Sequence, residues 1–204
     1  MNIVTRIPLL ALEVSGHGVP WLAIPILLFL CKTHLSATSA ALMLNFLALT
    51  VLDLLVILIL KPLFRRSRPV YNTGIGHVTL HAVDQFSFPS GHSTRGGFLS
   101  SFVCYSQYYY SAGLVSWAVS PIFTAFAIVW GLAICMSRVA LGRHHILDVV
   151  AGCMLGLSYV YAWQHFWIGE VMASDLRNDL RSTFFSTAVT YFPKMASGFE
   201  YPSS

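Results

Sequence analysis

The chain has 204 residues, of which only 10% are Asp, Glu, Lys or Arg, while 56% are hydrophobic and the mean hydropathy is +0.68. Soluble globular domains carry about 25% charged residues, and disordered chains are poor in apolar residues, so both classes are excluded. The net charge of +4 does not indicate a nucleic-acid-binding protein, because the basic residues are not spread over a solvent-exposed face. The composition predicts one integral membrane domain over residues 1–204.

Charge-free stretches give the expected membrane crossings. Residues 3–13 are apolar but too short to cross, which favours an interfacial helix. The long stretches without charge, apart from Asp53, are residues 14–31, 33–60, 96–137 and 149–169. A crossing helix needs about 20 residues, so residues 96–137 are expected to hold two crossings, with a turn marked by Gly113, Ser116 and Pro121. We therefore predict an all-α polytopic membrane helix bundle of about five transmembrane helices plus the interfacial N-terminal helix, with its core at 14–168 and a polar tail at 169–204.

Five crossings place three polar stretches on one side of the membrane: the N-terminus, residues 61–95 and residues 138–148. Most of the basic residues lie there. The positive-inside rule would make that side cytoplasmic, but several of these cations are candidates for chemistry, so the orientation stays open.

The first candidate motif is KPLFRRSRP, in which Lys61 and Arg68 are seven residues apart. On a helix this spacing puts both cations on one face, where they can meet one ligand, and Pro69 would end the helix. A basic stop sequence at a membrane interface explains the motif equally well when it is taken alone.

The second motif is FSFPSGHSTR. Pro89 suits the first turn of a helix, and the backbone N–H groups of Ser90, Gly91 and His92 would form an anion site at the helix N-terminus. His92 can exchange a proton near neutral pH. The alternative is a capped interfacial turn.

The third motif is SRVALGRHHILD. Arg138 closes one crossing, and His144 and Asp148 stand at i and i+4 at the start of the next. Asp148 would accept a hydrogen bond from one nitrogen of His144 and leave the other nitrogen nucleophilic. An interfacial histidine paired with a helix-start carboxylate is the alternative, but three such coincidences on one membrane face favour a functional site. His145 is expected to point about 100° away from it.

Asp53 lies inside an apolar crossing, where a carboxylate is costly unless it is paired or hydrated. It either supports Lys61 or lines the route of a lipid head group, or it is hydrogen-bonded through Asn45 or Thr50.

The three motifs together, Lys61-x6-Arg68-Pro69, Pro89-Ser90-Gly91-His92 and Ser137-Arg138-x5-His144-x3-Asp148, resemble the signature motifs of the type 2 phosphatidic-acid phosphatases, or lipid phosphate phosphatases. Vanadium-dependent haloperoxidases share this superfamily. The resemblance covers roughly residues 14–168, and members usually have six crossings. The flanking sequences LEVSGHGVPW, RRSRP, DQFSFPSGHSTR and LGRHHILDV are similar to those of the presqualene or polyisoprenoid diphosphate phosphatase branch.

The resemblance implies catalytic roles for His144 as a nucleophile that forms a phosphohistidine, Asp148 as its orienting partner and His92 as the general acid. The residues that it implies for phosphate binding are Lys61, Arg68, Ser90, Gly91 and Arg138. Three fixed cations can neutralise the phosphoryl oxygens, so no metal or other cofactor is expected. The implied substrates are isoprenoid diphosphates such as presqualene or farnesyl diphosphate. The expected partners are this lipid and the bilayer of the endoplasmic reticulum or nuclear envelope, with no nucleic acid and with the oligomeric state open.

Three other functions stay open: a broad phosphatase for phosphatidate, lysophosphatidate or sphingosine phosphate, a non-catalytic lipid-binding membrane protein, and a vanadate-dependent oxidoreductase. Four further arginines would either hold the inner phosphate of a diphosphate or touch lipid head groups: Arg65, Arg66, Arg95 and Arg143.

Overall fold

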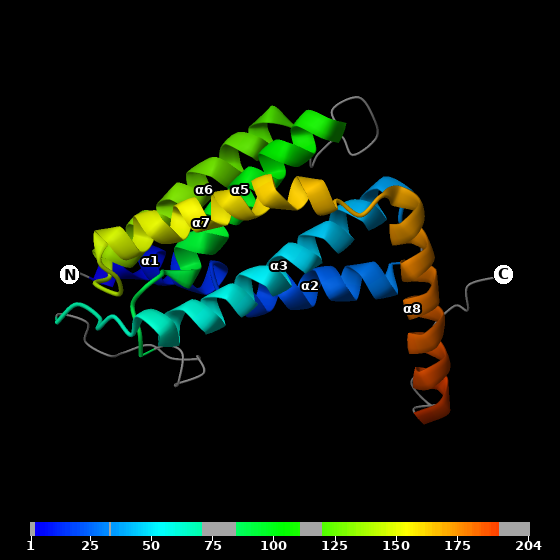
Figure 1. Ribbon diagram of the computed structural model, residues 1–204, viewed down its shortest axis with the longest axis horizontal. Coiled ribbons are helices and arrows are strands. Elements are labelled where there is room, and N and C mark those ends of the chain that lie inside the picture. Colours follow the sequence, from blue (N-terminus) through cyan, green and yellow to red (C-terminus); the bar gives the residue numbers. More distant parts are fainter. Residues whose placement is uncertain (1–2, 33, 71–84, 111–119, 192–204) are drawn as a thin grey trace. The chain divides into compact units, whose positions relative to one another are not determined.

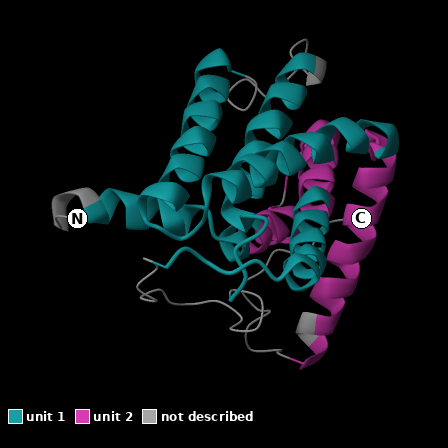
Figure 2. Cartoon of the chain, turned by 60° about the vertical axis from the view of Figure 1, so that its left-hand side comes forward, with its two compact units in different colours: residues 1–21, 49–166 teal, residues 22–48, 167–204 magenta. Residues whose placement is uncertain are grey.

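The computed structural model describes residues 3–32, 34–70, 85–110 and 120–191, and over these ranges the regular elements are helices. The all-α prediction is confirmed. The elements are α1 (Ile3–Ser15), α2 (Gly18–Cys31), α3 (Ala37–Phe64), α5 (Gly91–Tyr110), α6 (Pro121–Ala140), α7 (Ile146–Trp163), a 3-10 turn η1 (Gln164–Phe166) and α8 (Glu170–Tyr191). They form two compact units (Figure 2).

The first unit comprises Met1–Trp21 and Leu49–Phe166, and α5 is at its centre, packed against both α6 and α7 (Figure 1). Small residues allow this packing. A Cβ atom at Gly96 of α5 would lie 2.9 Å from the carbonyl oxygen of Gly131 in α6, and one at Gly152 of α7 would lie 2.6 Å from the carbonyl oxygen of Ser90. The backbones of α6 and α7 therefore approach α5 directly, and the second motif is pressed against the start of α7.

The second unit comprises Leu22–Ala48 and Trp167–Ser204. Its buried apolar core is Phe29, Ala40, Ala41 and Ala173. The Asn45 side chain donates to the carbonyl oxygen of Ile168 and accepts from its N–H, both at 2.9 Å. Most of the expected polar tail is helix α8, and within this unit the Arg177 Nε donates to the carbonyl oxygen of Phe29 at 2.8 Å.

Three helical segments are long and apolar enough to cross a membrane: α3, α6 and Ile146–Phe166. A fourth candidate is the pair Arg6–Ser15 and Gly18–Cys31, which is bent by 48°. The chain is thus an integral membrane protein, while the predicted count of five crossings is not confirmed, because α5 does not meet the same criterion. Of the expected turn residues, Gly113 and Ser116 lie outside the described residues, and Pro121 begins α6.

Candidate active site

The third motif is folded back on itself just after α6. The carbonyl oxygen of Arg138 accepts hydrogen bonds from the N–H groups of Arg143, at 3.0 Å, and His144, at 3.3 Å. This reversal requires the left-handed backbone of Gly142, with φ of 68°, which glycine adopts without steric cost. The five-residue spacing between Arg138 and His144 therefore brings the two side chains to one place.

His144 is almost fully buried, with 3% of its surface exposed. Its Nδ1 lies 2.7 Å from the backbone carbonyl oxygen of Ser87. Because a carbonyl oxygen only accepts, Nδ1 carries the proton and donates it, so the neutral ring has its lone pair on Nε2. Burial is the main cause that holds the His144 pKa well below the usual 6.5, and the positive charges of Arg68 and Lys61 lower this pKa further. The imidazole is therefore neutral and has a fixed tautomer, with the free lone pair on Nε2 that a nucleophile would need.

Asp148 is placed differently from the sequence expectation. Its Oδ2 is 4.0 Å from His144 Nδ1, which is too long for the expected hydrogen bond. The two oxygens instead accept from Arg66 Nη1, at 2.7 Å, and from the N–H of His145, at 2.8 Å. The expectation of a helical i, i+4 pair was wrong, because α7 begins at Ile146 and His144 precedes it. Sequence reasoning gave no signal for Ser87, which supplies the bond in its place.

Lys61 and Arg68 reach the site from different local structures. Helix α3 ends at Phe64, and Arg65 is left-handed, with φ of 47°. The expectation that Pro69 ends the helix and that both cations share one helical face was therefore wrong. Lys61 is buried in the last turn of α3, whereas Arg68 extends from the following non-helical segment, with Nη1 3.5 Å from the carbonyl oxygen of Arg143.

That non-helical segment is tied to the residue that orients His144. The N–H of Ser87 donates to the carbonyl oxygen of Arg66 at 2.8 Å, and its hydroxyl donates to that of Ser67 at 3.0 Å. The first and third motifs are thus joined through the segment that leads into the second.

The second motif presents a smaller anion site than expected. Helix α5 begins at Gly91, so Pro89 precedes the helix and is not in its first turn. The N–H of Ser90 is already donated to the carbonyl oxygen of Asp148, at 3.1 Å. Gly91 and His92 occupy the first turn, where N–H groups have no partner within the helix. They remain the backbone donors that the second motif can offer to an anion.

Glu13, in the last turn of α1, is a residue of this site that sequence reasoning missed. Its carbonyl oxygen is 3.0 Å from His92 Nε2, and its carboxylate Oε1 is 3.3 Å from Arg138 Nη1 and 3.6 Å from Arg143 Nε. In the sequence it stands only as a charge before the first long apolar stretch. Nothing there indicates that it meets the second and third motifs.

The model of the PAP2 superfamily matches residues 40–170 of this chain. The chain belongs to the PAP2 superfamily. Among curated proteins it is 32% identical over 128 residues to a protein of Arabidopsis thaliana described as a probable lipid phosphate phosphatase beta, an alignment that covers 52% of this chain and 56% of the relative. The chain thus spans about half the length of this curated relative, and no solved structure matches it.

Asp53 in this PAP2 domain has a partner that neither sequence alternative named. Its Oδ2 is 3.1 Å from Arg95 Nε, and both side chains are buried. Arg95 Nη1 also donates to the carbonyl oxygen of Gly16 at 3.1 Å. Helix α3 is thereby linked to α5 and to the end of α1, close to Glu13 of the candidate site.

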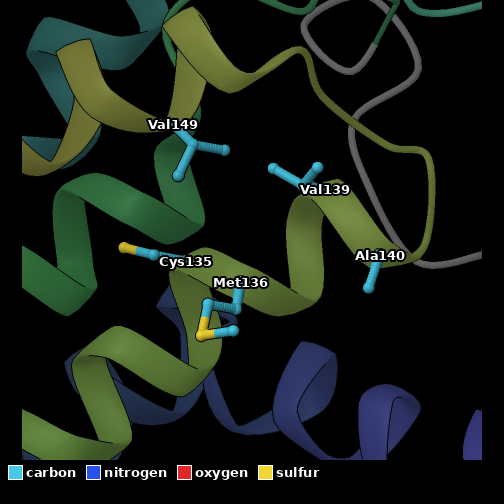
Figure 3. Close-up of a pocket in the computed structure, with 5 residues that line it drawn as sticks. All are labelled: Cys135, Met136, Val139, Ala140 and Val149. Carbon is cyan, nitrogen blue, oxygen red and sulfur yellow. The ribbon is translucent and has the colours of Figure 1, made fainter.

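An apolar hollow lies beside the PAP2 motifs, between the end of α6 and the start of α7. It is lined by Cys135, Met136, Val139, Ala140 and Val149. Figure 3 shows the side chains of Val139 and Val149 pointing toward one another across it. These two valines directly follow Arg138 and Asp148 in the chain, so apolar surface begins next to the polar site.

Proposed function

We propose that this protein hydrolyses lipid phosphates by forming a phosphohistidine on Nε2 of His144, without a metal ion. The observation that carries the proposal is the 2.7 Å contact from His144 Nδ1 to the Ser87 carbonyl oxygen, because it leaves Nε2 as the nucleophilic nitrogen. Membership of the PAP2 superfamily and the relative described as a probable lipid phosphate phosphatase support the same activity.

In the first step, Nε2 of His144 attacks phosphorus and the bond from phosphorus to the leaving oxygen breaks. His92, protonated on both ring nitrogens, gives that oxygen a proton and becomes neutral; as the neutral base it then takes a proton from water, which attacks the phosphohistidine and releases phosphate. Lys61, Arg68 and Arg138 neutralise the phosphoryl oxygens, with the Ser90 hydroxyl and the Gly91 N–H as further donors. Phosphoryl transfer depends mainly on positioning and electrostatic stabilisation, which these cations supply in place of a metal.

Asp148 acts in this scheme as a positioning residue. It holds Arg66 at 2.7 Å and the N–H of His145 at 2.8 Å, and its carbonyl oxygen accepts from Ser90. It therefore holds the main chain directly after His144, the side chain of Arg66 and the start of the second motif.

Isoprenoid diphosphates are the substrates that we propose within this activity, on the strength of the resemblance of the motif flanks. Two of the four additional arginines are engaged elsewhere, Arg66 with Asp148 and Arg95 with Asp53. Lys61, Arg68 and Arg138 form what we call the cation cage. Arg143 is the additional cation beside it, with its Nε 3.6 Å from Oε1 of Glu13, and we assign Arg143 to the second phosphate. Equal kcat/KM values for farnesyl diphosphate and phosphatidate would leave only the broader lipid phosphatase.

The decisive experiment is phosphate release from a lipid panel by the purified protein in detergent, in excess EDTA, with His144→Ala as the test variant. We expect a loss of at least about 10³-fold in kcat, inhibition of the unsubstituted protein by vanadate, and acid-labile ³²P labelling that disappears in the variant. The matched control is His165→Ala, which removes an exposed histidine of η1 and should leave turnover unchanged. Normal turnover by His144→Ala, or a strict magnesium requirement, contradicts the mechanism.

A further inference from the structure

Glu13 offers a carboxylate to the same cations that the proposed mechanism assigns to phosphate. Its Oε1 is 3.3 Å from Nη1 of Arg138, a residue with 1% of its side chain exposed, and 3.6 Å from Nε of Arg143. A carboxylate and a phosphoryl group present similar oxygens to a guanidinium group. The position of the Glu13 carboxylate is therefore one that a phosphoryl oxygen of the substrate would take.

The carboxylate fills this place only in part. Arg138 Nη2 is buried and makes no hydrogen bond to any of the described residues. A buried guanidinium donor without an acceptor is costly. A phosphoryl group has three oxygens and more charge than a carboxylate, so it can satisfy donors that Glu13 leaves open.

The Glu13 main chain is held firmly while its side chain can leave. Its carbonyl oxygen accepts from His92. Close by, Ser15 is bound by two indoles: Trp21 Nε1 donates to its carbonyl oxygen at 2.7 Å and Trp130 Nε1 to its hydroxyl at 3.2 Å. The Glu13 side chain, in contrast, is 25% exposed. Displacing the carboxylate therefore needs a side-chain rotation and no movement of α1.

We propose that Glu13 is a displaceable counter-ion, which occupies the cation cage between turnovers, yields to the phosphoryl group of the substrate, and returns as phosphate leaves. This inference rests on the proposed function for its role in turnover, although anion binding tests it separately. An internal carboxylate on the cage weakens the binding of every phosphate-like anion, including the product. Glu13 thus limits product inhibition and sets the KM for anionic head groups.

The test variant is Glu13→Gln, which keeps the shape of the side chain and removes its charge. We expect the Ki values of inorganic phosphate and of orthovanadate to fall by about five-fold, as for a partly exposed ion pair, with a lower KM and no increase in kcat. Glu170→Gln is the control, because it makes the same charge change on α8, where the carboxylate accepts from Thr38. It should leave both Ki values unchanged.

The same comparison is made without catalysis, by following the thermal stabilisation of the detergent-solubilised protein against phosphate concentration. Glu13→Gln should be stabilised at about five-fold lower phosphate than the unsubstituted protein. Equal or weaker anion binding by Glu13→Gln overturns the inference and makes Glu13 a residue that only positions Arg138. Tighter anion binding in a protein that hydrolyses no lipid phosphate supports the counter-ion and contradicts the proposed function instead.

Discussion

His144 Nδ1 lies 2.7 Å from the backbone carbonyl oxygen of Ser87. This single contact sets the tautomer of the imidazole, since the acceptor has no proton to give. It also comes from the main chain of a residue that is itself anchored to Arg66 and Ser67. The orientation of His144 therefore depends on the path of the chain before α5, and the side chain of Asp148 affects it only indirectly, through Arg66 and the N–H of His145.

The pairing of Arg66 with Asp148 gives the first prediction. Arg66→Gln leaves a fully buried carboxylate without its cation, so we expect kcat to fall by about 10- to 100-fold for phosphatidate and for farnesyl diphosphate alike. Asp148→Asn should lose activity to a similar degree, and less than His144→Ala. The measurement is kcat/KM on both lipids.

Arg65→Gln is the matched control for Arg66→Gln. Arg65 is exposed, and its Nε donates to the carbonyl oxygen of Pro62 in the last turn of α3. Its substitution should leave both substrates unaffected. Slower turnover of the diphosphate alone in Arg66→Gln would contradict the positioning role and restore Arg66 as a ligand of the second phosphate.

The buried pair of Asp53 and Arg95 gives a prediction about stability. Asp53→Asn leaves the buried guanidinium of Arg95 uncompensated, so we expect the free energy of unfolding in detergent to fall by about 3–5 kcal/mol. The double substitution Asp53→Leu with Arg95→Met removes both charges and should recover most of that loss. Thermal unfolding measures both effects, with Asp175→Asn, an exposed position of α8, as a control within about 0.5 kcal/mol. A double variant as unstable as Asp53→Asn would show that the ion pair itself is required.

The sequence predicted which residues meet better than it predicted their geometry. Spacing and residue type selected His92, His144 and Arg138, and the structure brings them together: Glu13 contacts both His92 and Arg138, and the N–H of His144 donates to the carbonyl oxygen of Arg138. The path of the chain was harder, since Arg65 in a left-handed conformation ends α3 before Pro69 can. This left-handed backbone conformation determines how Arg68 reaches the cation cage, and the helical periodicity of the sequence does not indicate it.

Ser87 and Glu13 were missed because a local sequence pattern does not indicate the contacts that they make. Ser87 acts through its carbonyl oxygen, which every residue has, so its identity carries no signal. Glu13 acts through partners from 79 to 130 residues away in the chain, which are His92, Arg138 and Arg143. Contacts of this kind depend on the packing of α1, α5 and α6. A pattern read along one segment does not contain them.

The environment of His144 predicts how stability depends on pH. Burial, Arg68 and Lys61 hold the pKa of this imidazole well below 6.5 in the folded protein, whereas the unfolded chain takes up the proton near pH 6.5. Below pH 6.5 the unfolded state therefore binds one more proton than the folded state. The His144 contribution to the free energy of unfolding is then fully present above pH 6.5 and falls by about 1.4 kcal/mol per pH unit as the pH drops toward the folded pKa. His144→Gln removes this contribution, so the unfolding free energy of the variant should depend less steeply on pH between about pH 6.5 and pH 5.

Nitrogen NMR of histidine-labelled protein gives an independent measurement. The signal that disappears in His144→Gln should be that of a neutral ring with its proton on Nδ1 throughout this pH range. A His144 signal that titrates at or above pH 6.5 would show that the cations and burial do not keep the nucleophile deprotonated.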